Sequence, residues 1–407
     1  MNLYRVDQQL ISAPLQDLTE AVHRALDAMN VPVPQGDVAI TAGSRGIDRI
    51  VEITRAAGDW LRARGAKPFL IPAMGSHNGA TAEGQRAMVE SLGLTREATG
   101  MEIRSSMACV RIGHVSSGDV WMDQHAYDAA GVLIINRIKL HTSFSGPIQS
   151  GLTKMMVVGM GKIKSAETFH SAPARQRPAM LTGMGHAIIS TGKVLGGLAI
   201  LEDGYDQAAE IHGIPGHAIL TREPALLERH RTYFPALPCD ELNVLIVDEI
   251  GKNFSGTGMD TNVIGRRGVR GDEDFARPRI RVIGALGLSA ASQGNGLGVG
   301  LADFITQGLR DAIDEQKTLI NVITTGDMQR MAIPATLRDD EELIKTIRSR
   351  YGDKGWMFIP NTLHLERLFV SEDVAAELRE KPRCLVADQS TPLTFSDGRF
   401  SLFDQAG

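Results

Sequence analysis

The chain has 407 residues, more than one hydrophobic core normally serves, so two domains are expected. Its hydrophobic fraction of 43% and charged fraction of 22% are those of an ordinary globular protein, and a net charge of −5 argues against nucleic-acid binding. It has no apolar run of about 18 residues that could cross a membrane, and its three widely spaced cysteines favour neither a disulfide framework nor a zinc knuckle, so a reduced, cytoplasmic location is expected.

In the first half of the chain, short runs rich in β-branched residues alternate with amphipathic segments. Strands are predicted at residues 38–40, 68–72, 131–139 and 195–203, and helices at 47–65, 81–93 and 179–191. Thr81 is the expected N-cap of the second of these helices. The alternation implies right-handed crossovers and a mainly parallel sheet.

The character of the sequence changes at residues 221–240, which are charged and then proline-punctuated, so we place a domain boundary there. Residues 1–236 are predicted to form an N-terminal α/β domain and residues 237–407 a C-terminal α/β domain. The second domain shows its own alternation, with strands predicted at 242–251, 279–287, 318–326, 356–360 and 367–370 and a helix at 302–315. The expected fold is therefore α/β, with mainly parallel sheets and a site in the cleft between the domains.

Three loops in the first half follow predicted strands, where ligands bind in sheets of this kind. They carry Arg45 in GSRGI, His77 in GSHNGAT and His141 in KLHTSFSG. Each residue alone is more often a solvated turn residue than a functional one. Three such loops at neighbouring strand ends favour a shared site, in which Arg45 holds an anion and two imidazoles act as general acid and base.

The segment from His141 to His170 also contains Lys154, which follows Ser150 and Gly151 in a stretch broken by small residues. Small residues let the backbone approach a ligand closely, and the lysine there would bind phosphate, form a covalent adduct or only cover apolar surface. The segment lacks the phosphate-binding pattern GxxxxGK[ST], and GNGLGVG at 294–300 matches the dinucleotide pattern GxGxxG only weakly.

In the second half, the loop after the strand at 242–251 is rich in glycine and mixed charges. Glu249 lies near the end of this strand and Lys252 at the start of the loop, and the region is equally compatible with a hydrated surface segment and with contacts to a substrate.

These motifs resemble the lactate racemase family, whose characterised members use a nickel-pincer nucleotide. The resemblance extends over most of the chain but is concentrated in a few positions. It implies that Arg45 holds the substrate carboxylate, that His77 and His141 are the catalytic acid and base, and that Lys154, with Ser150 and Gly151 before it, binds the cofactor. His170 stands sixteen residues after Lys154, the spacing of the family's nickel ligand, and Glu249 and Lys252 fit its substrate contacts loosely.

The resemblance also implies an isomerase that inverts C2 of a 2-hydroxy acid by reversible hydride transfer to the cofactor. In these terms the N-terminal domain carries the cofactor and the catalytic histidines, and the C-terminal domain contributes substrate contacts. GSRGI stands where the family has D-x-T-R-P, and HNGAT where it has a histidine followed by Arg-Pro. Glu249 would repel a simple carboxylate, so a substrate such as a sugar acid is favoured over lactate.

Two alternatives remain open on the sequence. The first is a zinc-dependent hydrolase or lyase with His77, His141 and His170 as metal ligands. The second is a non-catalytic protein that binds a sugar acid or nucleotide. The expected partners are a small 2-hydroxy acid and, indirectly, the enzymes that build the cofactor; no nucleic acid or membrane is expected, and a homo-oligomer is compatible with the sequence.

Overall fold

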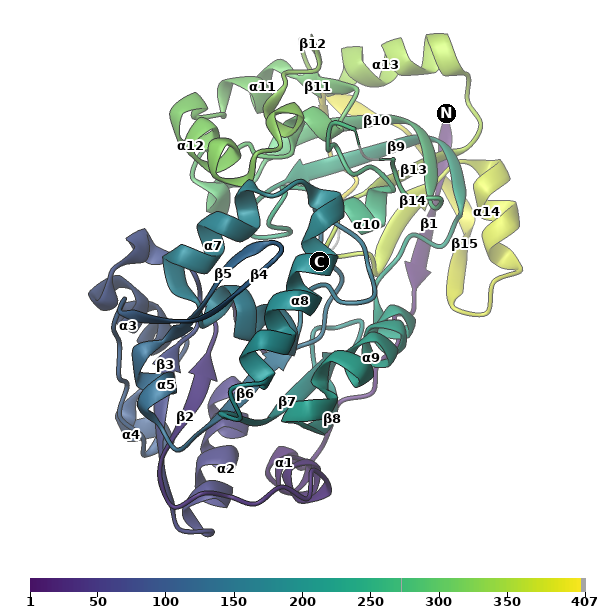
Figure 1. Ribbon diagram of the computed structural model, residues 1–407. Coiled ribbons are helices and arrows are strands. Elements are labelled where there is room, and N and C mark those ends of the chain that lie inside the picture. Colours follow the sequence, from purple (N-terminus) through teal and green to yellow (C-terminus); the bar gives the residue numbers. More distant parts are fainter. Residues whose placement is uncertain (272, 404–407) are drawn as a thin grey trace. The chain divides into compact units, whose positions relative to one another are not determined.

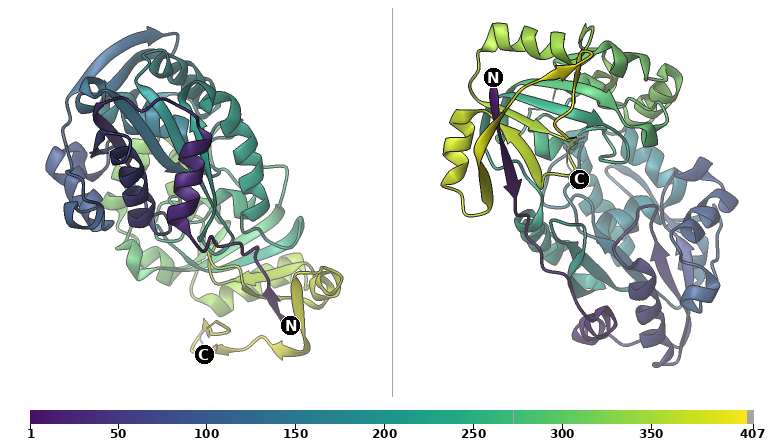
Figure 2. Two further views of the ribbon diagram at one scale, coloured as in Figure 1. Left: turned by 90° about the horizontal axis from the view of Figure 1, so that it is seen from below. Right: turned by 180° about the vertical axis from the view of Figure 1, so that it is seen from behind.

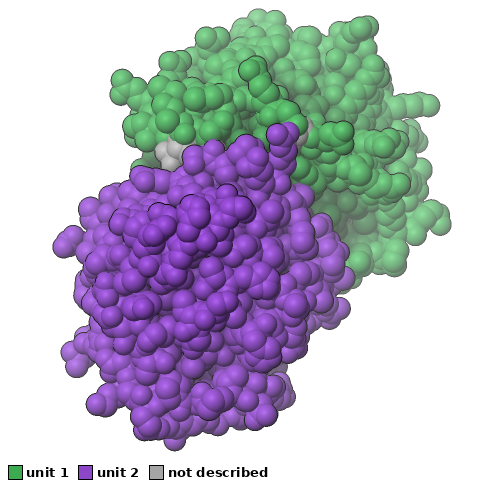
Figure 3. Space-filling model, viewed as in Figure 1, with its two compact units in different colours: residues 1–10, 235–407 green, residues 11–234 purple. Residues whose placement is uncertain are grey.

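The computed structural model describes residues 1–271 and 273–403, and it divides into two compact units. Unit 1 comprises Met1–Leu10 and Pro235–Gly407, and unit 2 comprises Ile11–Phe234 (Figure 3). Residue 272 and the last four residues of the predicted C-terminal domain lie outside the described residues. Each unit contains its own largely parallel sheet with helices, which confirms the predicted α/β class.

The main sheet of unit 2 has the strand order β3-β2-β6-β7-β8. Neighbouring strands are parallel except β7 and β8, which are antiparallel. After β2 the chain adds β3 on one side and β6 on the other, so the direction of winding reverses between β2 and β6. In open parallel sheets, ligands bind at the carboxyl ends of the strands beside such a reversal. The strands are β2 (Gly36–Ala42), β3 (Ala66–Pro72), β6 (Gly131–Arg137), β7 (Val194–Glu202) and β8 (Ala208–Pro215).

One face of this sheet is covered by helices α1 (Leu18–Ala28) and α2 (Ile50–Arg62), which contact each other. Both appear in purple beside the sheet in Figures 1 and 2. Their apolar residues, including Val22 and Trp60, join side chains such as Ile40 in one buried core. The interior of β2 is buried continuously, as expected for a parallel strand covered on both faces.

The segments that carry the predicted site residues contact the other strands and one another. Helix α6 contacts β6, β7, α8 and α9, and α7 contacts the hairpin of β4 and β5. Thr81 caps α3 by accepting a hydrogen bond from the Gly84 backbone N–H, which confirms the predicted cap. The elements are α3 (Ala82–Ser91), α4 (Arg96–Thr99), β4 (Cys109–Val115), β5 (Gly118–Asp123), α5 (Gln124–Asp128), α6 (Leu152–Lys154), a π-helical turn (Met155–Gly159), α7 (Lys162–Ser171), α8 (Arg177–Ile189) and α9 (Ile219–Tyr233).

The large sheet of unit 1 has the order β12-β11-β10-β9-β13-β14-β1-β15. It is parallel from β12 to β13 and antiparallel from β13 to β15. Its strands are β1 (Asn2–Gln8), β9 (Glu241–Ile250), β10 (Arg279–Leu288), β11 (Phe304–Thr306), β12 (Ala335–Leu337), β13 (Trp356–Ile359), β14 (Arg367–Val370) and β15 (Cys384–Pro392), and a small hairpin follows in β16 (Phe395–Ser396) and β17 (Arg399–Phe400). Its helices are α10 (Thr261–Ile264), α11 (Gln307–Asp311), α12 (Glu315–Thr325), α13 (Asp340–Tyr351) and α14 (Glu372–Arg379).

The strand predicted at 318–326 is wrong, because this segment belongs to helix α12. Asp314 caps the helix through the Lys317 backbone N–H, and Gly326 ends it in the left-handed conformation with φ of 82°. The helix predicted at 302–315 is instead strand β11 followed by the short helix α11. Residues 294–300 lead into a 3-10 turn rather than an α-helix, and a Cβ on Gly298 would stand 1.8 Å from the Thr257 carbonyl oxygen, so close packing of two loops explains that glycine.

The first ten residues belong to unit 1, although the sequence assigned them to the N-terminal domain. Strand β1 pairs antiparallel with both β14 and β15, and in Figure 1 it lies in purple among these yellow strands. The change of unit near Phe234 falls in the segment where the sequence placed the boundary. Within the described residues, no helix combines the length and apolar character needed to cross a membrane.

Candidate functional site

Arg45 lies in the turn that follows β2. Its side chain is exposed, and within residues 1–271 and 273–403 its guanidinium makes no hydrogen bond or ion pair. The protein atoms around it, together with the charge of Arg137, lower the pKa of Arg45. Arg137 is itself paired with Glu202. A guanidinium in this setting is suited to bind an anion such as a carboxylate.

His77 lies on the loop that follows β3. Its Nδ1 lies 2.6 Å from the Met74 carbonyl oxygen, and its backbone N–H donates to the same oxygen at 3.2 Å. Because a carbonyl oxygen can only accept, Nδ1 must carry the proton, and Nε2 of the neutral ring carries the basic lone pair. The ring is exposed, so this lone pair belongs to a group that a substrate can reach.

His141 lies on the loop that follows β6, and its ring is fixed in the opposite tautomer. Its Nδ1 accepts a hydrogen bond from the Ser143 backbone N–H at 3.0 Å, so the proton of the neutral ring is on Nε2. That nitrogen lies 2.8 Å from Lys154 Nζ. The loop is held at its base by paired backbone hydrogen bonds between Lys139 and Ser150, and the His141 N–H donates to Gln149 Oε1 at 2.7 Å.

Lys154 is at the end of α6, where the chain continues into the π-helical turn. Since His141 presents Nε2–H, the amine must accept this hydrogen bond and is therefore uncharged in this arrangement. Burial, with the charges of Arg177 and Arg45, lowers the pKa of Lys154 to about 8. The hydrogen bonds fit a free amine, and the lowered pKa makes this nucleophilic form far more populated than in an ordinary lysine.

Glu223 holds the start of the segment that carries Lys154. Its Oε2 accepts from the Thr153 backbone N–H at 2.9 Å and from the Thr153 hydroxyl at 2.7 Å. Burial raises the pKa of this carboxyl group to about 7. Its Oε1 has no hydrogen-bond partner among the described residues, and a Cβ on Gly151 would lie 2.1 Å from it. The glycine is therefore explained by the close approach of Glu223.

Ser150 and Gly151, predicted to bind the cofactor, contribute backbone hydrogen bonds to the protein itself. Ser150 pairs with Lys139, and the Gly151 carbonyl oxygen accepts from Asn136 Nδ2 at 2.9 Å. These bonds fix the backbone just before Lys154. Contacts of either residue with a cofactor remain a prediction.

His170 lies in the last turn of α7. Burial, followed by the charges of Lys154, Arg177 and His77, lowers the pKa of His170 to about 4. The ring is therefore neutral at physiological pH, the form that binds a metal ion. Arg177 Nη2 donates to the His170 carbonyl oxygen at 3.0 Å and fixes the end of the helix. A chain of ring contacts runs from His141 through Phe144 and Phe169 to His170, with successive centroids 4.2, 5.8 and 5.5 Å apart.

Five of the predicted residues therefore form one cluster within unit 2. Lys154 bonds to His141, its pKa responds to the charge of Arg45, and the pKa of His170 responds to Lys154 and His77. In the described part of the chain, no three His, Cys, Asp or Glu side chains form a group suited to hold a metal ion. A nickel ion that takes one imidazole from the protein and its other ligands from a nucleotide requires no such group.

Glu249 and Lys252 lie in unit 1, at the end of β9 and in the loop after it. Glu249 is exposed. Lys252 Nζ donates to the Gly256 carbonyl oxygen at 2.6 Å and to Asn321 Oδ1 at 2.8 Å, so the side chain supports its own loop and α12. Their contact with a substrate remains a prediction.

Several residues that shape the cluster were not predicted. Glu223 acts on Thr153 across 70 residues, whereas Arg177 lies only seven residues after His170; no local pattern marks either residue. Gln149 lies between His141 and Lys154, and its position close to Gly146 and Gly151 could have indicated a role in this loop. Lys162 and Gln85, described below, support the His77 loop.

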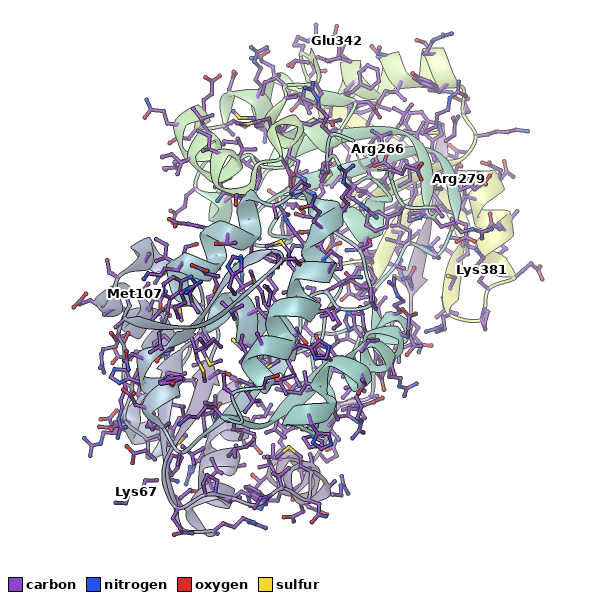
Figure 4. The ribbon with its side chains drawn as sticks, viewed as in Figure 1. Lys67, Met107, Arg266, Arg279, Glu342 and Lys381 are labelled. Atoms are coloured by element: carbon purple, nitrogen blue, oxygen red, sulfur yellow. The ribbon has the colours of Figure 1, made fainter. Side chains whose placement is uncertain are left out.

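A cavity of 540 Å³ lies in unit 1 near the amino ends of β9 and β10. Arg266 and Arg279, both labelled in Figure 4, are among its lining residues. Arg266 forms an ion pair with Asp303 at 2.7 Å and donates hydrogen bonds to backbone carbonyl groups. None of the predicted site residues lines this cavity.

No protein-family model matches the chain, and no curated protein sequence matches it. Among solved structures, it is similar to the lactate racemase apoprotein from Thermoanaerobacterium thermosaccharolyticum, with a TM-score of 0.55 and 14% identity over 88% of this chain and 94% of that chain. It is also similar to a protein from Thermotoga maritima, with a TM-score of 0.50 and 12% identity over 87% of this chain and 98% of that chain. At these identities, the comparisons show that the fold is similar to that of lactate racemase.

Proposed function

We propose that the protein is a racemase or epimerase that inverts C2 of a 2-hydroxy acid with a nickel-pincer nucleotide as cofactor. A sugar acid is the favoured substrate class. The similarity of the fold to lactate racemase supports the proposal, as does the cluster of Arg45, His77, His141, Lys154 and His170 within unit 2.

The observation that carries the proposal is the hydrogen bond of 2.8 Å between His141 Nε2 and Lys154 Nζ. With Ser143 donating to the other ring nitrogen, this bond requires an uncharged amine on Lys154. A lysine that only balanced charge or covered apolar surface would not need that state. A lysine that forms a covalent bond to a carbonyl or thioacyl carbon does need it.

The residues fit the proposed cofactor. Lys154 would carry the nucleotide through its amine, and the neutral imidazole of His170 would supply the protein ligand to nickel. When bound, the cofactor would supply a reversible acceptor for the hydride of C2. Arg177 would keep the His170 end of α7 in place through the backbone carbonyl oxygen.

The remaining residues would bind the substrate and move its proton. Arg45 would hold the carboxylate, which fixes C2 relative to the acid and base. His77 has its basic lone pair on Nε2, whereas His141 has its proton on Nε2. Once Lys154 carries the cofactor and no longer accepts from His141, one ring can take the proton of the 2-hydroxyl group while the other donates a hydrogen bond to the oxygen. Glu249 and Lys252 are proposed as further substrate contacts.

The test is expression of the protein together with enzymes that build the cofactor, followed by intact-mass spectrometry and metal analysis. We expect added mass and nickel in the wild type, and no added mass in Lys154→Ala. Lys67→Ala is the matched control, since this exposed lysine lies near the amino end of β3 (Figure 4). Chiral chromatography of a panel of 2-hydroxy acids should show racemisation that falls on the order of 10²-fold or more in His77→Ala and His141→Ala. Zinc without added mass, or nickel-loaded protein that inverts no member of the panel, would count against the proposal.

A further inference from the structure

Lys162 is a fully buried lysine at the start of α7, outside the set of residues assigned to the reaction. Its backbone has a φ of 54°, in the left-handed region that a side chain other than glycine rarely adopts. Burial of a charged group and an unfavourable backbone conformation at the same residue need a specific compensation.

The compensation is one ion pair and two hydrogen bonds. The ammonium group lies 3.1 Å from Asp123 Oδ2, donates to Gln85 Oε1 at 3.2 Å and donates to the Pro72 carbonyl oxygen. The ammonium group thus makes two hydrogen bonds, to α3 and to the end of β3, and one ion pair, to Asp123 of β5. Asp123 is also fully buried, and its Oδ1 accepts from the Ala126 backbone N–H.

Lys162 also determines which way the Gln85 amide points. Because the Gln85 Oε1 accepts from Lys162, the NH₂ group must face the other way. There it donates to the Gly75 carbonyl oxygen at 2.8 Å and to the His77 carbonyl oxygen at 3.5 Å. The buried amide therefore joins Lys162 to the backbone of the His77 loop.

A second connection joins the His77 loop to the chain just before Lys162. The Gly75 N–H donates to the Gly159 carbonyl oxygen at 3.1 Å, and a Cβ on Gly159 would lie 2.5 Å from the Ala73 carbonyl oxygen. The His77 loop thus packs directly against the π-helical turn that follows Lys154. Lys162 begins helix α7, whose last turn contains His170.

We propose that Lys162 is a positioning residue that, through Gln85, holds the His77 loop in register with the segment carrying Lys154 and His170. The importance of this register for catalysis rests on the proposed function, but the positioning itself is a property of the free protein. An apolar residue of the same length would fill the space without orienting Gln85.

Two variants test the proposal. Lys162→Met removes the ammonium group, and Gln85→Glu keeps an acceptor for Lys162 while removing both donors to the loop. Gln316→Glu, on the exposed surface of α12, is the control for the added negative charge. If Lys162→Met does not fold, the result for Gln85→Glu decides the test, because this variant keeps an acceptor at position 85 for the buried lysine.

The first readout is nitrogen NMR of ¹⁵N-histidine-labelled protein without cofactor, with the His77 signals assigned from His77→Gln. In the wild type and in Gln316→Glu we expect the Nδ1–H tautomer that the Met74 hydrogen bond requires. In folded Lys162→Met and Gln85→Glu we expect mixed tautomers. A wild-type His77 spectrum in folded Gln85→Glu would overturn the proposal.

The second readout uses protein loaded with cofactor. We expect kcat to fall at least 10-fold in both variants while KM and the mass added at Lys154 stay unchanged. If the wild type converts no 2-hydroxy acid, the proposed function fails, and the NMR comparison still decides whether Lys162 positions His77. Unchanged kcat in a variant whose His77 tautomer has changed would refute the catalytic importance of the register.

Discussion

The most direct prediction concerns the charge of Lys154 in the protein without cofactor. We expect the rate of its acylation to rise with pH around a midpoint near 8, because burial and the charges of Arg177 and Arg45 lower its pKa to about 8 from 10.5. At pH 7.5, an amine with that pKa is about one quarter unprotonated, against about one part in a thousand for an ordinary lysine. The difference is large enough to measure directly.

The assay is competitive labelling with acetic anhydride across pH 6–11, followed by digestion and mass spectrometry of the peptide that contains Lys154. A short lysine peptide in the same tube provides the reference. Partial burial lowers the absolute rate, but the midpoint still reports the pKa. Labelling whose midpoint coincides with that of the reference peptide would refute the argument from burial and hydrogen bonding.

A second test of the Lys154 pKa removes a neighbouring positive charge. Arg177→Met removes one of the positive charges that disfavour protonation of Lys154, so the midpoint should move upward. Arg175→Met is the control, because that exposed arginine is two residues away and does not contribute to the shift. Thermal unfolding of both variants shows whether they remain folded under the conditions of labelling. Equal midpoints in the two variants would contradict the role given to Arg177.

Three further predictions concern stability and are measured by urea denaturation. Gly151→Ala should lower the free energy of unfolding by ~1–3 kcal/mol, because its Cβ would lie 2.1 Å from Glu223 Oε1. Gly183→Ala, in open space on α8, should raise the free energy of unfolding by ~0.5–1 kcal/mol. Equal effects of the two substitutions would exclude the contact between residue 151 and Glu223. Glu223 has its pKa raised to about 7, so the folded state keeps a proton that the unfolded chain releases near pH 4.5. The retained proton contributes ~3 kcal/mol to the free energy of unfolding at low pH, and this contribution is lost as the pH rises through 7. Glu223→Gln should abolish this pH dependence. Parallel pH profiles of stability for the wild type and Glu223→Gln would disprove the prediction. Thr81→Ala should lower the free energy of unfolding by ~1 kcal/mol because the N-cap of α3 is lost, whereas Thr81→Ser should keep the cap. An unchanged urea midpoint in Thr81→Ala would show that the cap is unimportant.

The strands and site loops of unit 2 could be predicted because one physical rule connects them. Buried runs such as 131–139 predict parallel strands, and the carboxyl ends of parallel strands share one edge of a sheet. Arg45, His77 and His141 each follow such a strand, so their placement at the same edge of the sheet follows from the alternation. The sequence did not indicate which strands are neighbours, and so the reversal between β2 and β6 emerges only from the structure.

The segment at 318–326 shows where the periodicity of apolar residues is ambiguous. Its β-branched residues favour a strand, but its ends contain the signals of a helix, Asp314 before it and Gly326 after it. Ile320 and Ile323 are 69% and 60% exposed, so the segment is less buried than its apolar composition suggests. The capping residues at its two ends therefore indicated a helix more reliably than its β-branched interior indicated a strand.

The supporting residues of the site could not be predicted because their partners are far away in sequence. Glu223 acts on Thr153 across 70 residues, and Lys162 acts on Gln85 across 77. Hydrogen bonds over such separations depend on the final packing of helices that look unrelated in the sequence. The tautomers of His77 and His141 likewise follow from the backbone atoms that face each ring nitrogen.

The position of β1 between β14 and β15 has a consequence for synthesis of the chain. Strand β1 is synthesised well before β14 and β15, so it must wait without its partners until residues 367–392 have been translated. Ile11–Phe234 has every strand of its own sheet by then, so it can fold while the residues on either side are still incomplete. The protein is thus built as one domain inserted into another, and deletion of its first ten residues would open a gap in the sheet of a unit whose other residues begin at Pro235.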